Sequence, residues 1–273
     1  MKPITLALLF ALNLTILNAQ PPAKQLKKVS ELKIPREGGA NGATVAWHPV
    51  FKKYYAAMAG NVSYCLGIFD GAGKLLSPPG LNTKFDIRGL WYNPATKTLQ
   101  MNGYNDFGWC EYSLNSKGFP DTVKVLHEGM HQPDEQSVGA FNPQKKLVYF
   151  FNEDGNLDVY DLKDGEHQDN IELTLGKTKK DDEETDAASD SNYDVIDGYN
   201  SSSVVFTGVP GAEIGLLNHQ ESQVELYNLK DGHLTRKLAL PDDAPVNNFL
   251  NFSYCNGTWW LFDKESRIWK GYK

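Results

Sequence analysis

Short apolar runs alternate with turn residues along most of the chain, and the pattern repeats. The two clearest copies each hold three runs: Val138–Pro143, Leu147–Asn152 and Leu157–Gly165 in one, Val204–Pro210, Ile214–Asn218 and Val224–Gly232 in the other. Both place a Pro turn after the first run, an Asn at the end of the second, and Leu-Lys-Asp-Gly after the third. Short runs rich in Val, Tyr, Phe and Trp between Asn, Asp, Gly or Pro predict β-strands.

Three further copies follow the same order. Their first runs are Val45–Pro49, Leu90–Pro94 and Phe249–Gly257. The turn residues of the five copies fall at positions 49, 94, 143, 210 and 257, which are spaced by 45, 49, 67 and 47 residues. A period of about 40–50 residues built from short strands and tight turns predicts the blades of a β-propeller.

Two features complete this fold prediction. The runs Val148–Phe151 and Trp259–Phe262 are apolar at every position, as expected for strands covered on both faces. The fifth copy stops after its third run, and a run at about Lys24–Ile34 precedes the first copy. We therefore predict an all-β, five-bladed β-propeller, in which the N-terminal strand completes the last blade and removes the free edge. Six blades are the alternative.

The turns and the third runs also resemble a known group. The Asn-Pro turns at 93–94 and 142–143 and the Tyr-Asp-Leu-Lys-Asp-Gly segment at 160–165 resemble the broad WD40, NHL and YVTN-like superfamily of repeat propellers. The resemblance covers nearly all of the chain after the N-terminal segment, but the Gly-His and Trp-Asp pairs of WD40 repeats are absent. It implies architecture and a tendency toward binding, and no particular activity.

The N-terminus predicts export. Lys2 precedes the apolar stretch Ile4–Ile16, and Ala19 supplies a small residue for cleavage, so residues 1–19 are predicted to be a signal peptide. Residues 20–273 then form a single propeller domain, secreted or periplasmic. The apolar stretch is too short to span a bilayer comfortably. We predict a monomer without membrane insertion.

The net charge of the chain restricts the kinds of partner that the protein can bind. The chain carries a net charge of −7, which disfavours binding to nucleic acid. The segment 177–194 holds seven acids and three lysines, and it is predicted to be a mobile acidic loop. A calcium loop is the alternative, because Asp190, Asn192 and Asp194 have EF-hand spacing, although Val195 and Ser201 stand where Gly and Glu are needed.

The cysteines predict no metal or redox site. Cys65, Cys110 and Cys255 are far apart and form no C-x-x-C motif. We predict buried thiols and leave one disulfide open as the alternative. No cofactor and no bound metal are predicted.

Ligands of propellers usually bind where the loops that lead into the inner strands meet around the axis. The candidate residues at this axial mouth are Asp86, Arg88, Asn102, Asn105, His131, Asp134, Glu135 and Gln136. Arg88 binds an anionic ligand or pairs with Asp86, which lies two positions away on the same side of a strand. We treat these groups as exposed loop charges that contribute little to stability.

Two functions are compatible with this sequence. The first is an exported, non-catalytic binding or scaffold protein for an unknown protein or a polar small molecule, such as a sugar or an organic acid. The second is a hydrolase or lyase with carboxylates in the central funnel, formed by Asp86 with Asp134 or Glu135. Enzyme motifs such as G-x-S-x-G, H-E-x-x-H and the P-loop are absent from the sequence.

Overall fold

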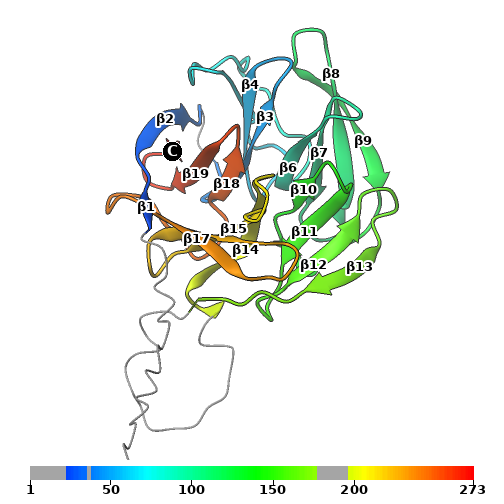
Figure 1. Cartoon of the computed structure of the whole chain (residues 1–273). Helices are drawn as coiled ribbons and strands as arrows, with labels where there is room; N and C mark the ends of the chain where they lie inside the picture. The colour runs from blue at the N-terminus through cyan, green and yellow to red at the C-terminus, as the bar shows by residue number, and fades with distance from the viewer. Residues whose placement is uncertain (1–22, 36–37, 177–195) are drawn as a thin grey trace, which may run out of the picture.

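The computed structural model describes residues 23–35, 38–176 and 196–273. These residues form five small sheets arranged in a ring (Figure 1). The predicted signal peptide and the predicted acidic loop lie outside the described residues. The prediction of an all-β, five-bladed propeller is confirmed, and the six-bladed alternative is wrong.

The strands of each blade run antiparallel to their neighbours. Blade 1 holds β3 (Gly42–His48), β4 (Lys53–Met58) and β5 (Gly67–Asp70). Blade 2 holds β6 (Ile87–Asn93), β7 (Thr98–Gly103), the 3-10 helix η1 (Asn105–Phe107), β8 (Trp109–Leu114) and β9 (Pro120–His127). Blade 3 holds β10 (Ala140–Asn142), β11 (Leu147–Phe151), β12 (Leu157–Asp161) and β13 (His167–Ile171).

The last two blades include the N-terminal strands. Blade 4 holds β14 (Tyr199–Phe206), β15 (Ile214–Asn218), β16 (Gln223–Tyr227), β17 (Leu234–Ala239) and the added β1 (Lys24–Gln25). Blade 5 holds β18 (Phe252–Cys255), β19 (Thr258–Asp263), β20 (Ile268–Tyr272) and β2 (Lys28–Lys33). The inner strands β3, β6, β10, β14 and β18 contact one another in that order, and β18 contacts β3, so the ring is closed.

The N-terminal segment closes the ring as predicted, with one correction. Strand β2 pairs antiparallel with β20, which completes blade 5. The predicted strand at 24–34 is not one strand, however, because β1 turns away and pairs in parallel with β17 of blade 4. The N-terminus therefore joins blades 4 and 5 and covers the outer edge of both.

Blade 1 departs from the predicted complete unit, since it has three strands in the described residues. The segment after β5 contains Pro78 and Pro79, which lack the N–H groups that a fourth strand must donate. The hydroxyl of Ser77 replaces part of the missing ladder, because it accepts from the Ile68 amide and donates to the Leu66 carbonyl.

The turns between the inner and second strands explain the Asn-Pro repeats. The side chains of Asn93 and Asn142 accept hydrogen bonds from backbone amides two residues on, which is the Asx turn that Asn favours. His48 stands at the same place in blade 1, where Nδ1 accepts from the Phe51 amide at 3.4 Å. His48 is thus a turn residue, as the alignment of the copies indicates.

The hydrophobic core lies between the blades. A cluster of buried residues fills each of the five spaces between neighbouring blades. Strand β11 is covered on both faces, with Val148, Tyr149, Phe150 and Phe151 each at most 1% exposed. Burying one large apolar side chain contributes about 1.5–3 kcal/mol, so the interfaces between blades hold the ring together. In the described residues we find no helix long and apolar enough to cross a membrane.

Candidate functional site

The inner strands run in one direction, so the axis has two different ends. We call the end where the inner strands begin the loop end, and the end where they turn into the second strands the turn end. The residues predicted from the sequence lie at the loop end, either in its loops or, for Arg88 and Asn102, near the start of β6 and the end of β7. The cavity that the structure contains on the axis lies toward the turn end.

A buried ion pair stands at the start of β6. Nη1 of Arg88 lies 2.7 Å from Oδ1 of Asp86, and the two side chains are 3% and 9% exposed. Nε of Arg88 donates to Oε1 of Gln136 at 2.8 Å, and the Gly60 amide donates to Asp86 Oδ1 at 2.8 Å. Of the two roles considered for Arg88, the structure shows the pair with Asp86. The assumption that Arg88 is an exposed loop charge is wrong.

Tyr104 and Glu135 extend this group. The Tyr104 ring lies 4.7 Å from the Arg88 guanidinium carbon. Interaction with the nearby Glu135 carboxylate raises the pKa of Tyr104. We call Asp86, Arg88, Tyr104, Glu135 and Gln136 the loop-end cluster. It combines two carboxylates, a guanidinium, a phenol and an amide.

The other predicted residues have separate partners. Asn102 is fully buried and fastens blade 2 to blade 3, since its Oδ1 accepts from the Gly139 amide at 3.0 Å. Nδ1 of His131 lies 2.9 Å from the Gly165 carbonyl, in the turn between β12 and β13. Asp134 is exposed and accepts from the Gln136 amide at 2.8 Å.

Asn105 is also exposed, in η1, and its backbone amide donates to the Glu135 carbonyl at 3.1 Å. The structure therefore brings together Asp86, Arg88, Glu135 and Gln136 of the predicted set. It gives Asn102 and His131 contacts that connect neighbouring blades. Ligand binding by any of the eight residues stays a prediction.

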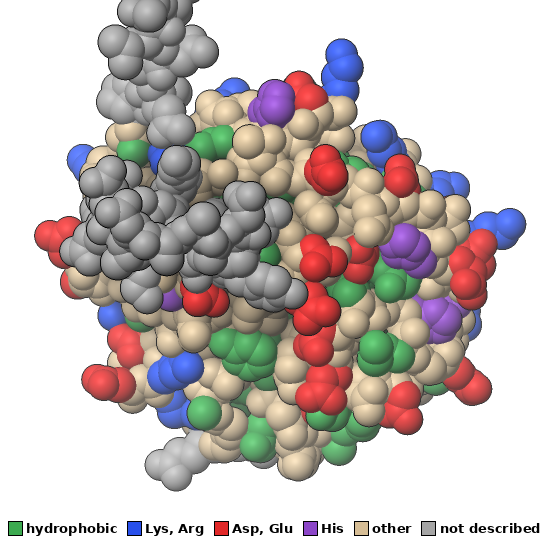
Figure 2. Space-filling model, turned by 90° about the horizontal axis from the view of Figure 1, so that it is seen from below, with side chains coloured by type: hydrophobic (Ala, Val, Ile, Leu, Met, Phe, Trp, Pro, Cys, Tyr) green, Lys and Arg blue, Asp and Glu red, His purple; other side chains and the backbone are tan. Residues whose placement is uncertain are grey.

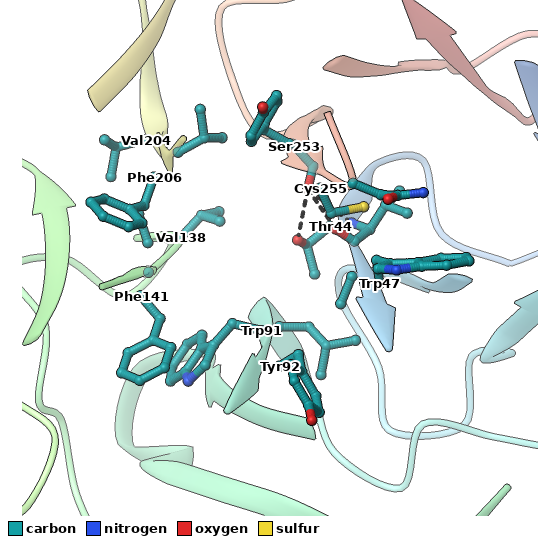
Figure 3. A pocket seen from close by; sticks show the side chains of 18 of the residues that line it. Thr44, Trp47, Trp91, Tyr92, Val138, Phe141, Val204, Phe206, Ser253 and Cys255 are labelled. Carbon is teal, nitrogen blue, oxygen red and sulfur yellow. Dashed lines mark hydrogen bonds between the residues drawn. The ribbon is translucent and has the colours of Figure 1, made fainter. Parts of the chain in front are cut away.

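A cavity of about 250 Å³ lies on the axis and is walled by all five inner strands (Figure 3). Figure 3 shows the side chains of the wall arranged around an open centre. The aromatic residues of the wall include Trp47, Trp91, Tyr92, Phe141 and Phe206. We call this space the axial cavity. Pro49 and Asn256 at its turn-end rim are exposed, so solvent reaches it from that side.

The wall of the axial cavity is polar through hydroxyls and the backbone. Oγ1 of Thr44 lies 3.1 Å from Oγ of Ser253, which also accepts from the Val45 amide at 3.0 Å. Each inner strand is the edge strand of its sheet, so one side of its backbone has no ladder partner within the sheet. The cavity therefore offers apolar surface together with neutral donors and acceptors.

Ionised groups are absent from the described residues of this wall, which include no Asp, Glu, His, Lys or Arg. The titratable groups of this wall are Tyr92, Tyr254 and Cys255, and burial raises the pKa of Cys255 and Tyr254. Neither is ionised near neutral pH.

All three cysteines are free thiols in the structure, so the disulfide alternative is wrong. Burial raises the pKa of Cys110 to about 11, as expected for an unreactive core thiol. Among the described residues, no group of three or more His, Cys, Asp or Glu could hold a metal ion. The predicted calcium loop begins in residues that the structure does not describe, and it remains untested.

Sequence reasoning placed no cavity on the axis, because it attributed the aromatic side chains to packing between blades; the structure does place Trp91 and Phe141 in such a cluster, and both also line the axial cavity. A signal was present. In three copies an aromatic residue stands two positions before the turn Pro, as Trp47, Tyr92 and Phe141. Repetition of a large side chain at one structural position would have placed three rings at the same level of the axis.

Comparison with known proteins supports the fold. No protein-family model matches the chain, and a search of curated proteins finds no match. The crystal structure of glutaminyl cyclase from Myxococcus xanthus is similar, with a TM-score of 0.54, 9% sequence identity, and coverage of 93% of this chain and 98% of that chain. A chain of a nidogen/laminin complex gives a TM-score of 0.42 at 11% identity, covering 76% of this chain and 66% of that one. At 9% identity the likeness to the glutaminyl cyclase concerns the fold alone.

Proposed function

We propose that this protein is an exported, non-catalytic binding module, secreted or periplasmic, whose axial cavity receives a small uncharged ligand. The observation that carries the proposal is the composition of the cavity wall. Five blades contribute aromatic surface and hydroxyls to it, and its described residues include no charged side chain. A rigid, concave and mostly apolar site with a few polar groups is typical of ligand binding.

Of the two polar ligand classes named from the sequence, this wall favours a neutral sugar over an organic acid. A carboxylate ligand is best held by a cation such as Arg, and the described wall of the cavity contains none. Hydroxyls such as those of Thr44 and Ser253, next to aromatic carbon, suit a neutral ring that is polar at its edge. The volume of about 250 Å³ restricts the ligand to a small group.

Matched pairs of ligands test this proposal. Neutral hexoses and the corresponding hexuronic acids are added separately, and binding is followed by melting temperature and tryptophan fluorescence, since Trp47 and Trp91 line the cavity. We expect the neutral members to bind. V138F, which fills the cavity, should abolish binding, whereas V125F at an exposed position should not. Binding of the acids alone, or binding that survives V138F in a folded protein, would contradict the proposal.

An enzyme is the second candidate, and the loop-end cluster is the observation that favours it. A carboxylate next to a phenol and a guanidinium is an acid–base arrangement that a hydrolase or lyase could use. One structural neighbour is a glutaminyl cyclase, so the substrate panel includes a peptide with N-terminal glutamine, assayed by ammonia release, besides glycosides. Turnover that is lost in both E135Q and Y104F would favour this candidate over the binding module.

A further inference from the structure

Lysine side chains gather on the turn end, beside the mouth of the axial cavity. Blades 1, 2 and 3 join their inner and second strands by turns of equal length, at 49–52, 94–97 and 143–146. The last residues of these turns are Lys52, Lys97 and Lys146, which we call the mouth lysines. All three are exposed, and none forms an ion pair with the described residues.

The backbone of these turns does not explain the choice of lysine. The mouth lysines have φ angles of 51°, 60° and 59°, in the left-handed region that Gly and Asn adopt most easily. In the corresponding turn of blade 5, Asn256 and Gly257 take φ angles of 51° and 66°. Lysine therefore costs conformational energy at three equivalent positions, which favours a role for its charge.

The neighbouring turns offer little negative charge to offset the mouth lysines. All five turns between inner and second strands are described, and among them only that of blade 4 holds an acidic residue, Glu213. The Glu213 carboxylate accepts from the amides of Gly211 at 2.8 Å and Leu229 at 3.1 Å. In contrast, the face shown in Figure 2 carries a band of acidic side chains with few basic ones among them, in a chain of net charge −7. An anionic group is therefore attracted to the turn end rather than to that face.

The size of the axial cavity divides a ligand between the inside and the mouth. Its volume of about 250 Å³ receives a single sugar unit, and its described wall carries no charged side chain. A group linked to that sugar stays outside, at the turn end, where Pro49 and Asn256 are exposed. An anionic group there lies beside the mouth lysines and does not enter the neutral cavity.

We infer that the axial cavity binds a neutral sugar that is linked to an anionic group, either a phosphate or an acidic sugar of a glycan. The sugar enters the cavity, and the anionic group stays at the mouth, where the mouth lysines donate charge-assisted hydrogen bonds to it. This inference rests on the proposed function, because it concerns the same cavity. It does not extend to a hexuronic acid, whose carboxylate lies on the ring that would enter the cavity.

Matched ligands that differ in the linked anion test the inference. Glucose, galactose and N-acetylglucosamine are each compared as the 1-phosphate and as the methyl glycoside. A trisaccharide of N-acetylglucosamine, glucuronate and N-acetylglucosamine is compared with chitotriose, and inorganic phosphate is the control. By titration calorimetry on the full chain at low salt, we expect an anionic member to bind about fivefold more tightly than its neutral partner. The difference should disappear at about 1 M salt.

The pairs also identify the source of the anion. Preference for the 1-phosphates identifies a glycosyl phosphate, and preference for the acidic trisaccharide identifies a glycan. Equal affinity in every pair at low salt overturns the inference and leaves the proposed function intact. Inorganic phosphate that binds as tightly as the 1-phosphates also overturns it, because the sugar would then contribute nothing.

Variants locate the anionic group. Replacing the three mouth lysines by Gln should abolish the preference and leave the affinity for methyl glycosides unchanged. The matched control replaces Lys117, Lys163 and Lys230 by Gln, which removes three exposed lysines from turns between third and fourth strands, and it should keep the preference. A preference that survives without the mouth lysines, or is lost equally in the control, overturns the inference alone. If neither member of any pair binds, or if V138F binds both unchanged, the proposed function fails and the inference fails with it.

Discussion

The two ends of the propeller axis use opposite chemistry. At the loop end, Arg88 and Asp86 pair with each other, and Gln136 and the Gly60 amide take further hydrogen-bonding positions. Toward the turn end, the axial cavity is walled by aromatic rings and hydroxyls without a charged side chain among its described residues. The charged side chains of the loop end are thus largely engaged with one another and with neighbouring groups. The described cavity wall toward the turn end has no charged side chain, and it surrounds an open space.

This difference shows that titratable residues in a loop are weak evidence for a ligand site. Charged groups that are buried at 3% and 9% exposure need partners to offset desolvation, and they find them within the protein. Aromatic side chains at strand ends leave space, because rigid rings on five separate strands do not fill a common axis completely.

Removal of the N-terminal strands should have the largest effect, because both ends require a closed ring. Deleting residues 24–33 removes β1 and β2 and exposes the outer edge of β20. It also removes the core contacts of the buried Leu32 side chain. We expect unfolding or aggregation, measured by circular dichroism and size-exclusion chromatography. K28Q, which breaks only a half-exposed ion pair with Glu31, serves as the control and should melt like the full chain. A truncated protein that melts normally would disprove closure.

R88A should have the second-largest effect. It leaves the Asp86 carboxylate buried with the Gly60 amide as its remaining partner, and breaking a buried pair costs about 3–5 kcal/mol. Urea denaturation measures the loss. The double variant D86N with R88M removes both charges and keeps an acceptor for Gly60, so it should recover most of the stability. A loss below about 1 kcal/mol in R88A would show that the pair behaves as a surface pair.

Much of the fold follows from the sequence, because the repeats record it directly. The Asn-Pro turns marked the ends of β6 and β10, and the leftover run at each terminus indicated the shared last blade. The split of the N-terminal run into β1 and β2 was not predictable, since no feature of the local sequence specifies that Lys24 and Gln25 pair with β17. The three-stranded blade 1 was readable in part from Pro78 and Pro79.

The site was harder to predict than the fold. Sequence order places Asp86, Arg88, Glu135 and Gln136 in loops at one end, and the structure brings them together. Whether such groups pair or stay free depends on burial, which the sequence does not state for a loop. His131 illustrates this limit, because its ring nitrogens lie 2.9 and 2.8 Å from the carbonyls of Gly165 and Glu128.

S253A removes a polar group from the wall of the axial cavity and should have an intermediate effect on stability. The Ser253 hydroxyl accepts from the Val45 amide and donates to the Val45 carbonyl at 2.9 Å, which joins blade 5 to blade 1. Its removal leaves buried backbone groups unpaired and should cost about 1–3 kcal/mol. Denaturation measures this value, and S266A in an exposed turn is the control. An unchanged stability would mean that water replaces the hydroxyl in the cavity.

H48N should have the smallest effect and should appear only in acid. Burial lowers the pKa of His48 from 6.5, and protonation would also place an N–H at Nδ1 against the Phe51 amide. Because the folded pKa lies below the unfolded one, the stability that neutral His48 supports is complete above pH 6.5 and is lost as the pH falls below that value. Asn occupies the same turn position in blades 2 and 3, so H48N keeps the turn and removes the titration.

The measurement compares the melting temperatures of H48N and the unaltered protein between about pH 8 and about pH 5. We expect similar values at the upper limit, apart from the lost ring contacts with Phe51 and Tyr92, and a smaller decrease for H48N in acid. Parallel curves for H48N and the unaltered protein would show that His48 is already solvated, and the turn end would then be more open than its buried histidine indicates.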